Sequence, residues 1–288
     1  MHITSTILSL GLTHAVAAHG GGQYYEIDGV LHRGQVVFLF LHTSSCQIDL
    51  WIMRQTLLTL CSRNWDELNN TEGSIQRLWT WGDNIYHLNS EYFACSYTGV
   101  PGPNSYHAPH TAGSVISINY TVTSKKEDDG RPWTFGHSHG PMSAYLAACP
   151  DEGCQDVDLS DTMWFKIWHA GLLEGTWQEG YWAMRDVWLG ANLDITTPKN
   201  LKPGKYLFRH ETINLEGGAA QFFPNCIQLD ISGDGDRFPD EAELVAFPGA
   251  YDKDEEYSFV TLRGSEWFYT EHRGDTVYPL PGPPVWEG

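Results

Sequence analysis

The stretch I-S-I-N-Y-T-V at residues 116–122 decides the fold class. Its first, third, fifth and seventh residues are apolar or aromatic and the three between them are polar, which is the two-residue period of a half-buried β-strand. Further strands are predicted at residues 23–27, 142–148, 164–168, 205–215 and 227–231. Many short strands joined by irregular Gly, Pro and Asp links predict an all-β fold, an antiparallel immunoglobulin/fibronectin-like β-sandwich with long loops.

The composition supports strands and limits the partners. The 288 residues include 29 Gly, 12 Trp and 14 Tyr, and only 18% are charged, a profile that favours strands and turns over long helices. The formal net charge is −19. Nucleic acid and anionic membranes need basic surfaces, so we expect neither as a partner, whereas a neutral polymer such as a polysaccharide remains compatible.

The first 18 residues have the pattern of a signal peptide. A short apolar run, residues 3–12, is followed by A-V-A-A at residues 15–18, a small-residue cleavage site. Cleavage after Ala18 would leave a single domain, residues 19–288, secreted to the extracellular space. It would also make His19 the first residue, and the amine and ring Nδ1 of such a histidine can chelate one metal ion. With one more imidazole they form a three-nitrogen site that suits copper; the alternative is that His19 merely follows the cleavage site.

Residues 36–63 differ in composition from the rest of the chain. They contain no Gly and no Pro and carry three apolar runs. This segment is predicted to be an insertion, either a buried helical one or the product of a retained intron, since valine codons begin with GT and serine or arginine codons can carry the closing AG. A transcript that keeps these codons as coding sequence would contradict the intron hypothesis.

Six cysteines in an exported chain indicate disulfides. Cys149 and Cys154 bracket a short turn and are expected to pair locally, which leaves Cys95 and Cys226 as a long-range bridge. The other two cysteines lie in the predicted insertion. Two glycosylation sequons, at Asn69 and Asn119, fit a secreted glycoprotein.

The C-terminal end of the chain is rich in aromatic residues and proline. Residues 278–286 are Y-P-L-P-G-P-P-V-W. Because such a density of aromatic side chains argues against disorder, we expect this segment to wrap around the sandwich as ordered coil.

Several motifs occur together in a fixed order along the chain. They are H-G at residues 19–20, S-I-Q-R at 74–77 before Trp79, Y-H-A-P at 106–109 before A-G at 112–113, G-P-M at 140–142 before Y-L-A at 145–147, W-F-K-I at 164–167, P-G-K-Y at 203–206, R-H-E at 209–211, Q-F-F-P-N-C at 221–226, and residues 278–286. In this set and order the chain resembles the fungal lytic polysaccharide monooxygenases of auxiliary activity family 9, formerly glycoside hydrolase family 61. Each motif is weak alone, and only residues 36–63 lack a counterpart.

The resemblance implies a copper site and two disulfides. It assigns His19 and His107 as the ligands of one copper ion per chain, with a surface histidine as the alternative for His107. It places Gln221 beside the copper as a catalytic residue, the alternative being an amide satisfied by backbone. It implies the disulfides Cys95–Cys226 and Cys149–Cys154.

Two positions depart from the family pattern. Phe223 stands where the family normally has an axial tyrosine, and it is expected to be axial and non-ligating. Glu216 stands where the family usually has a histidine near the copper; it could take a catalytic, proton-handling role or be an exposed loop carboxylate. His110 is expected to face solvent, and His210 to be an interior histidine.

The implied function is copper-dependent oxidative cleavage of β-1,4-linked plant cell-wall polysaccharide, cellulose or a related glucan, by a monomer. The reaction would use O2 or H2O2 and an external electron donor or redox partner. The alternative is a secreted copper-binding or carbohydrate-binding protein on the same scaffold without catalysis. A hydrolase would need two carboxylates facing a cleft, and no motif selects such a pair.

Overall fold

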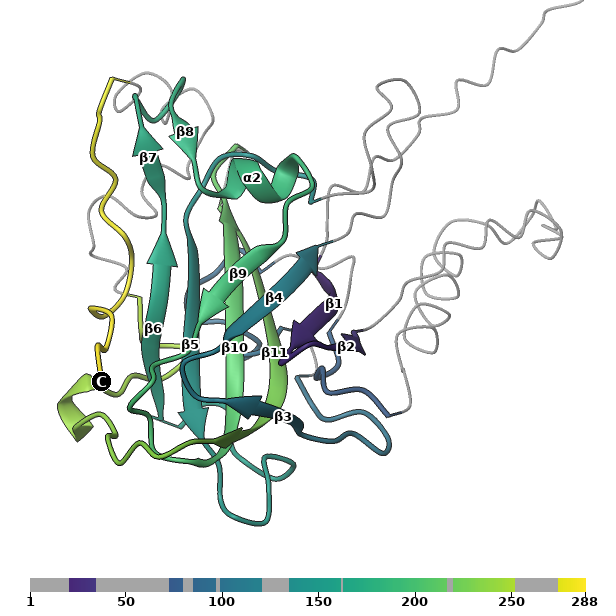
Figure 1. Ribbon diagram of the computed structural model, residues 1–288. Helices are drawn as coiled ribbons and strands as arrows, with labels where there is room; N and C mark the ends of the chain where they lie inside the picture. The colour runs from purple at the N-terminus through teal and green to yellow at the C-terminus, as the bar shows by residue number, and fades with distance from the viewer. Residues whose placement is uncertain are drawn as a thin grey trace, which may run out of the picture.

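The computed structural model shows a β-sandwich (Figure 1). The predicted signal peptide, His19 and the predicted insertion at 36–63 lie outside the residues that the structure describes. Those residues are 21–34, 73–79, 85–96, 99–120, 135–161, 163–216, 220–251 and 274–288.

The first layer is a four-stranded antiparallel sheet in the order β2-β1-β4-β9. Its strands are β1 (Gly22–Ile27), β2 (Val30–Arg33), β4 (Val115–Tyr120) and β9 (Leu193–Thr196). Asp28 and Gly29 connect β1 to β2 with positive φ angles of 48° and 77°, which two-residue hairpin turns of this kind require.

The second layer is a five-stranded sheet in the order β3-β11-β10-β5-β6. Its strands are β3 (Ala108–Thr111), β5 (Met142–Ala148), β6 (Trp164–Ala170), β10 (Gly204–Asn214) and β11 (Gln221–Ser232). All pairs are antiparallel except β3 with β11, which is parallel. Smaller elements are the hairpin β7 (Leu172–Glu174) and β8 (Tyr181–Trp182), the helix α2 (Met184–Trp188) and the 3-10 turn η1 (Glu241–Glu243).

Burial differs between the two sheets for a physical reason. In β4 the alternation is regular, because Ile116, Ile118 and Tyr120 are buried while their neighbours are partly exposed. In β10 almost every residue is buried, because a second apolar cluster covers the outer face of the five-stranded sheet. The predicted all-β sandwich is confirmed, and the predicted strands lie within β1, β4, β5, β6, β10 and β11 apart from end residues.

His210 joins the two layers between the sheets. Its Nε2 lies 2.9 Å from the hydroxyl of Tyr25 in β1, and its Nδ1 lies 2.6 Å from the hydroxyl of Tyr120 in β4. The ring is fully buried, and desolvation, with the charge of Arg209 in addition, lowers its pKa to about 3. His210 is therefore the interior histidine that the sequence predicted, and it is neutral in the folded chain.

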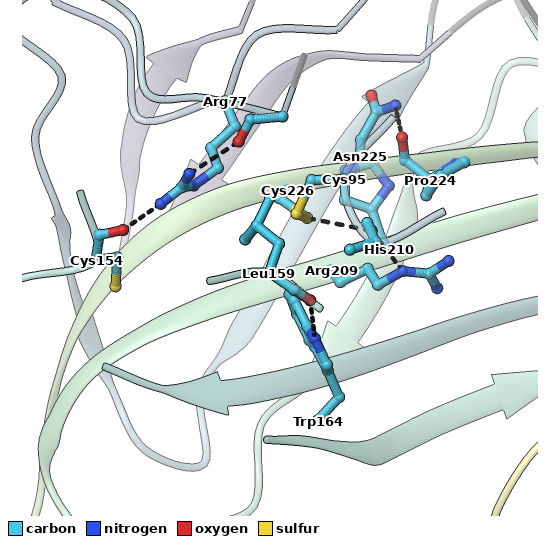
Figure 2. Close-up of a disulfide and its surroundings, with 12 residues drawn as sticks. Arg77, Cys95, Cys154, Leu159, Trp164, Arg209, His210, Pro224, Asn225 and Cys226 are labelled. Carbon is cyan, nitrogen blue, oxygen red and sulfur yellow. Dashed lines mark hydrogen bonds between the residues drawn. A yellow bond between two sulfur atoms is a disulfide. The ribbon is translucent and has the colours of Figure 1, made fainter. Parts of the chain in front are cut away.

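Both predicted disulfides are confirmed. Cys95–Cys226 attaches the 85–96 segment to the outer face of β11, and Cys149–Cys154 closes the turn after β5. Figure 2 shows Arg77 reaching the carbonyl oxygen of Cys154 and Arg209 lying near Cys226. Arg209 donates to the carbonyl oxygens of Ala94 (2.7 Å) and Phe93, so the bridge and a buried cation hold the same segment.

The C-terminal residues 274–288 run along the β6 edge of the sandwich (Figure 1). Lys166 Nζ donates to the carbonyl oxygen of Pro281 at 2.6 Å, and the amide of Trp286 donates to the carbonyl oxygen of Lys166 at 2.7 Å. The Trp286 ring packs edge-on against Phe165 at 5.3 Å. This part of the tail is thus anchored coil.

Replacing Trp286 by alanine should destabilise the fold by about 3 kcal/mol, because a large ring leaves the core cluster without a replacement. Urea unfolding of the variant measures this change. Val277→Ala is the matched control in the same segment, since Val277 is 76% exposed, and it should change the unfolding free energy by less than about 0.5 kcal/mol. Equal effects of the two substitutions would contradict the anchoring role.

Acid should weaken the fold through His210. Below the ordinary histidine pKa of 6.5 the unfolded chain binds a proton that the folded chain, with a His210 pKa of about 3, does not bind. Stability that is present at pH 7 is therefore lost as pH falls, by about 2 kcal/mol between pH 7 and pH 5 for one such group. In urea unfolding, the free energy of unfolding of His210→Gln should fall less between pH 7 and pH 5 than that of the parent chain. His87→Gln, at an exposed position, is the control and should behave like the parent. A His210→Gln variant with the pH dependence of the parent would contradict the assignment.

Candidate metal centre

The loop that enters β5 lies against the end of β10. The carbonyl oxygens of His139 and Pro141 accept hydrogen bonds from the amides of Leu215 and Ile213, both at 3.0 Å. Gly140 has a φ of 145°, and a Cβ there would lie 1.8 Å from the carbonyl oxygen of Ile213. Only glycine permits this close approach, which places the His137-Ser138-His139 tripeptide beside Leu215 and Glu216, the two residues that follow β10.

Glu216 binds that tripeptide through both carboxylate oxygens. His137 Nδ1 lies 3.1 Å from Oε2, and His139 Nδ1 lies 2.9 Å from Oε1. Ser138 donates to Oε1 from its amide (2.9 Å) and its hydroxyl (2.7 Å). Burial raises the pKa of the Glu216 carboxyl, but the hydrogen bonds from His137, His139 and Ser138 outweigh it and hold the pKa well below its usual range. Glu216 is therefore an ionised, fully engaged carboxylate.

The two ring nitrogens of His137 differ in their hydrogen bonds to the described residues. Its ring lies between Phe135, at 5.6 Å, and Phe223, at 5.8 Å between centroids. Because Nδ1 donates to a carboxylate, a neutral ring carries its lone pair on Nε2. That Nε2 is buried and has no hydrogen-bond partner among the residues that the structure describes. Buried polar atoms rarely stay unpaired, and the Nε2 lone pair is one that a further group could use.

Gln221 and Phe223 lie on the same side of β11, at the N-terminal end of the strand. Phe223 is buried against Phe135 and His137 and offers no ligand atom. Gln221 Oε1 accepts from Asn214 Nδ2 at 2.6 Å, and its Nε2 donates to the hydroxyl of Tyr86 at 3.2 Å. Side chains, rather than the backbone, therefore hold the Gln221 amide.

We call His137, His139, Glu216 and Phe223 the imidazole–carboxylate cluster.

His107 does not lie with this cluster. It precedes β3, whose Ala108 pairs with Leu229 of β11. Leu229 is six residues beyond Phe223, and six strand residues span about 20 Å. His107 Nε2 instead accepts a hydrogen bond from the amide of Cys154 at 3.2 Å, and burial followed by the charge of Lys205 lowers its pKa.

His110 is also placed differently from the expectation. It is buried rather than exposed to solvent, and its Nε2 lies 2.8 Å from the hydroxyl of Thr197. Its Nδ1 lies 3.6 Å from Asp28. These contacts make it a structural residue between β3 and the loop after β9.

The described chain starts close to the imidazole–carboxylate cluster. The Gly22 amide donates to Asn225 Oδ1 at 3.0 Å, and the Gly22 carbonyl oxygen accepts from Gln76 Nε2 at 3.0 Å. Asn225 is two residues from Phe223 on the same side of β11, and Gly22 pairs with Tyr120, whose ring contacts Phe135 at 5.5 Å. A Cβ on Gly21 would lie 2.5 Å from Asn225 Oδ1, so glycine is required there.

Sequence reasoning missed His137 and His139. Both lie directly before the Gly140-Pro141 motif and the start of β5, and that position was the available signal. Among the described residues, no three His, Cys, Asp or Glu side chains group closely enough to hold a metal ion alone. No helix in the described part of the chain has the length and apolar character to cross a membrane.

Comparison with known proteins agrees with the fold and the motifs. The model of Auxiliary Activity family 9 (formerly GH61) matches residues 55–269. The AA9 family lytic polysaccharide monooxygenase-like protein CEL1 of Agaricus bisporus is 34% identical over 283 residues, covering 97% of this chain and 74% of that protein. AA9 family lytic polysaccharide monooxygenase B of Heterobasidion irregulare is 28% identical, covering 95% and 93%.

Solved structures give the same result. The crystal structure of HiLPMO9B superposes with a TM-score of 0.70 at 26% identity, covering 94% of this chain and 100% of that one. Members of the family are copper-dependent enzymes that degrade polysaccharide oxidatively with an external reductant. The chain belongs to auxiliary activity family 9, the lytic polysaccharide monooxygenases.

Proposed function

We propose that this chain oxidatively cleaves β-1,4-linked plant cell-wall polysaccharide, cellulose or a related glucan, with His19 and His137 holding one copper ion. The observation that carries the proposal is the buried Nε2 of His137, which has no hydrogen-bond partner among the described residues. A metal-ligating histidine characteristically donates its other ring N–H to a carboxylate, as His137 does to Glu216.

The position of Gly22 supports His19 as the other ligand. Asn225 and Gln76 hold both backbone polar groups of Gly22 beside the Phe223 end of β11. His19 lies two residues before Gly21, and two residues extend about 7 Å at most. After removal of residues 1–18, His19 would contribute its amine and its ring nitrogen, which are donor atoms that copper prefers.

The residues around this centre have separate roles. His19 and His137 would hold the copper, which would supply the redox chemistry for oxidising a C–H bond at the glycosidic linkage with O2 or H2O2 and an external electron donor. Phe223 keeps polar ligands away from one side and, unlike tyrosine, can neither coordinate nor donate a hydrogen bond. Gln221, oriented by Asn214 and Tyr86, is the residue that we assign to hydrogen-bond the oxidant.

The cellular setting follows from the same proposal. Residues 1–18 would direct the chain out of the cell, and the amine of His19 becomes available only when they are removed. The protein would act outside the cell as a monomer on an insoluble polymer, which fits a metal centre at the end of the five-stranded sheet better than one in a deep pocket.

His137→Ala should weaken copper(II) binding by more than about 100-fold, because it removes an imidazole ligand from a site with few others. His107→Ala is the matched control and should change the dissociation constant by less than about threefold, since its Nε2 is already bonded to Cys154. Calorimetric titration of the mature chain, beginning at His19, measures both. Loss of binding in the His107 variant alone would restore the assignment made from sequence.

The mature chain with copper, a reductant and hydrogen peroxide should release oxidised oligosaccharides from cellulose, detected by mass spectrometry. A chain with one extra alanine before His19 should release none, because the amide nitrogen it creates cannot replace the free amine. Tight copper binding without oxidised products from cellulose or other β-1,4-glucans would instead support a secreted copper-binding protein without catalysis.

A further inference from the structure

Glu216, two residues after β10, stands out because its one side chain contacts three consecutive residues of a different loop. Glu216 accepts from His137 on Oε2 and from Ser138 and His139 on Oε1, so both carboxylate oxygens are occupied. Its side chain is 28% exposed, so these bonds are partly screened from water. Because both oxygens of the Glu216 carboxylate accept hydrogen bonds, the carboxylate orients His137, Ser138 and His139. It has little capacity left to accept and release protons.

The backbone of Glu216 is also held. Its amide donates to Asn214 Oδ1 at 2.8 Å, while Asn214 Nδ2 donates to Gln221 Oε1 at 2.6 Å. One asparagine therefore links the carboxylate that binds the two imidazoles to the amide of Gln221. The neighbouring residue, Leu215, donates its amide to the carbonyl oxygen of His139 at 3.0 Å, which ties the strand end to the loop.

We propose that Glu216 is the positioning residue of the metal centre, holding the proton of His137 on Nδ1 so that the Nε2 lone pair is directed to the metal. The inference rests on the proposed function, because it takes His137 as a ligand. His139 is held by the same carboxylate but lies 24% exposed, with its ring 6.5 Å from Trp182 rather than against Phe223.

The negative charge of Glu216 has a second effect. A carboxylate that accepts from a ligand imidazole makes that imidazole more basic and a better donor to a cation. A more basic donor set favours copper(II) over copper(I). A neutral side chain at position 216 should therefore raise the reduction potential of the bound copper.

The test replaces Glu216 by glutamine in the mature full-length chain. A carboxamide has one acceptor oxygen in place of two, so it cannot accept from His137 and His139 together in the same way. Copper(II) affinity should fall about 10-fold to 100-fold, the range for residues that support a ligand histidine, and the reduction potential should rise. Glu174→Gln, an exposed change on β7, is the matched control and should alter neither quantity.

A measurement without metal keeps the test independent of catalysis and of the stability of the variant. Nitrogen chemical shifts of the His137 ring in the metal-free parent chain should show the proton on Nδ1, and Glu216→Gln should shift the ring towards the other tautomer. A parent ring protonated on Nε2 would overturn the proposal outright.

The two proposals fail in different ways. If His137→Ala loses copper while Glu216→Gln binds it like the parent, Glu216 does not position the ligand although the metal centre stands. If His137→Ala binds copper like the parent, the metal centre is misassigned and the role of Glu216 falls with it.

Discussion

The antiparallel pairing of β10 with β11 is the constraint on which the rest of the molecule depends. It runs without a break from Gly204 opposite Ile231 to Asn214 opposite Gln221. This register places Gln221, Phe223 and Glu216 at one end of the five-stranded sheet. It places Lys205 and Leu229, with the neighbouring His107, at the other end. A shift of one residue would turn His210 out of the space between the sheets and Arg209 into it.

Successive side chains of β10 point to opposite faces of the sheet, and the two faces have different partners. Arg209 points to the outer face, where its guanidinium lies 3.9 Å from the Phe247 ring centroid and 2.7 Å from a Glu211 oxygen. His210 points inward to Tyr25 and Tyr120. Because both groups are fully buried, each needs its partners in place, and the strand can therefore adopt only one position relative to the layers that cover it.

The departures from the family pattern meet in one place. Phe223 offers no phenol oxygen, and its ring packs against His137. Glu216 introduces a charge, and four donors from three residues compensate it. Neither change is an isolated surface substitution, because both contact the same imidazole. The first strand reaches this end through the hydrogen bonds of Gly22, so the described start of the chain and the loop before β5 converge on the same region.

Local pattern in the sequence determined the strands, the short-range disulfide and the interior place of His210, because each depends on neighbours or on a two-residue period. Ordered motifs also determined the family and selected Gln221, Phe223 and Glu216. Only the tertiary structure decided which histidine joins them. His107 and His137 both precede strands of the same sheet, but β3 enters beside the end of β11 and β5 beside the end of β10, and this choice depends on long-range pairing that the residues near each histidine do not encode.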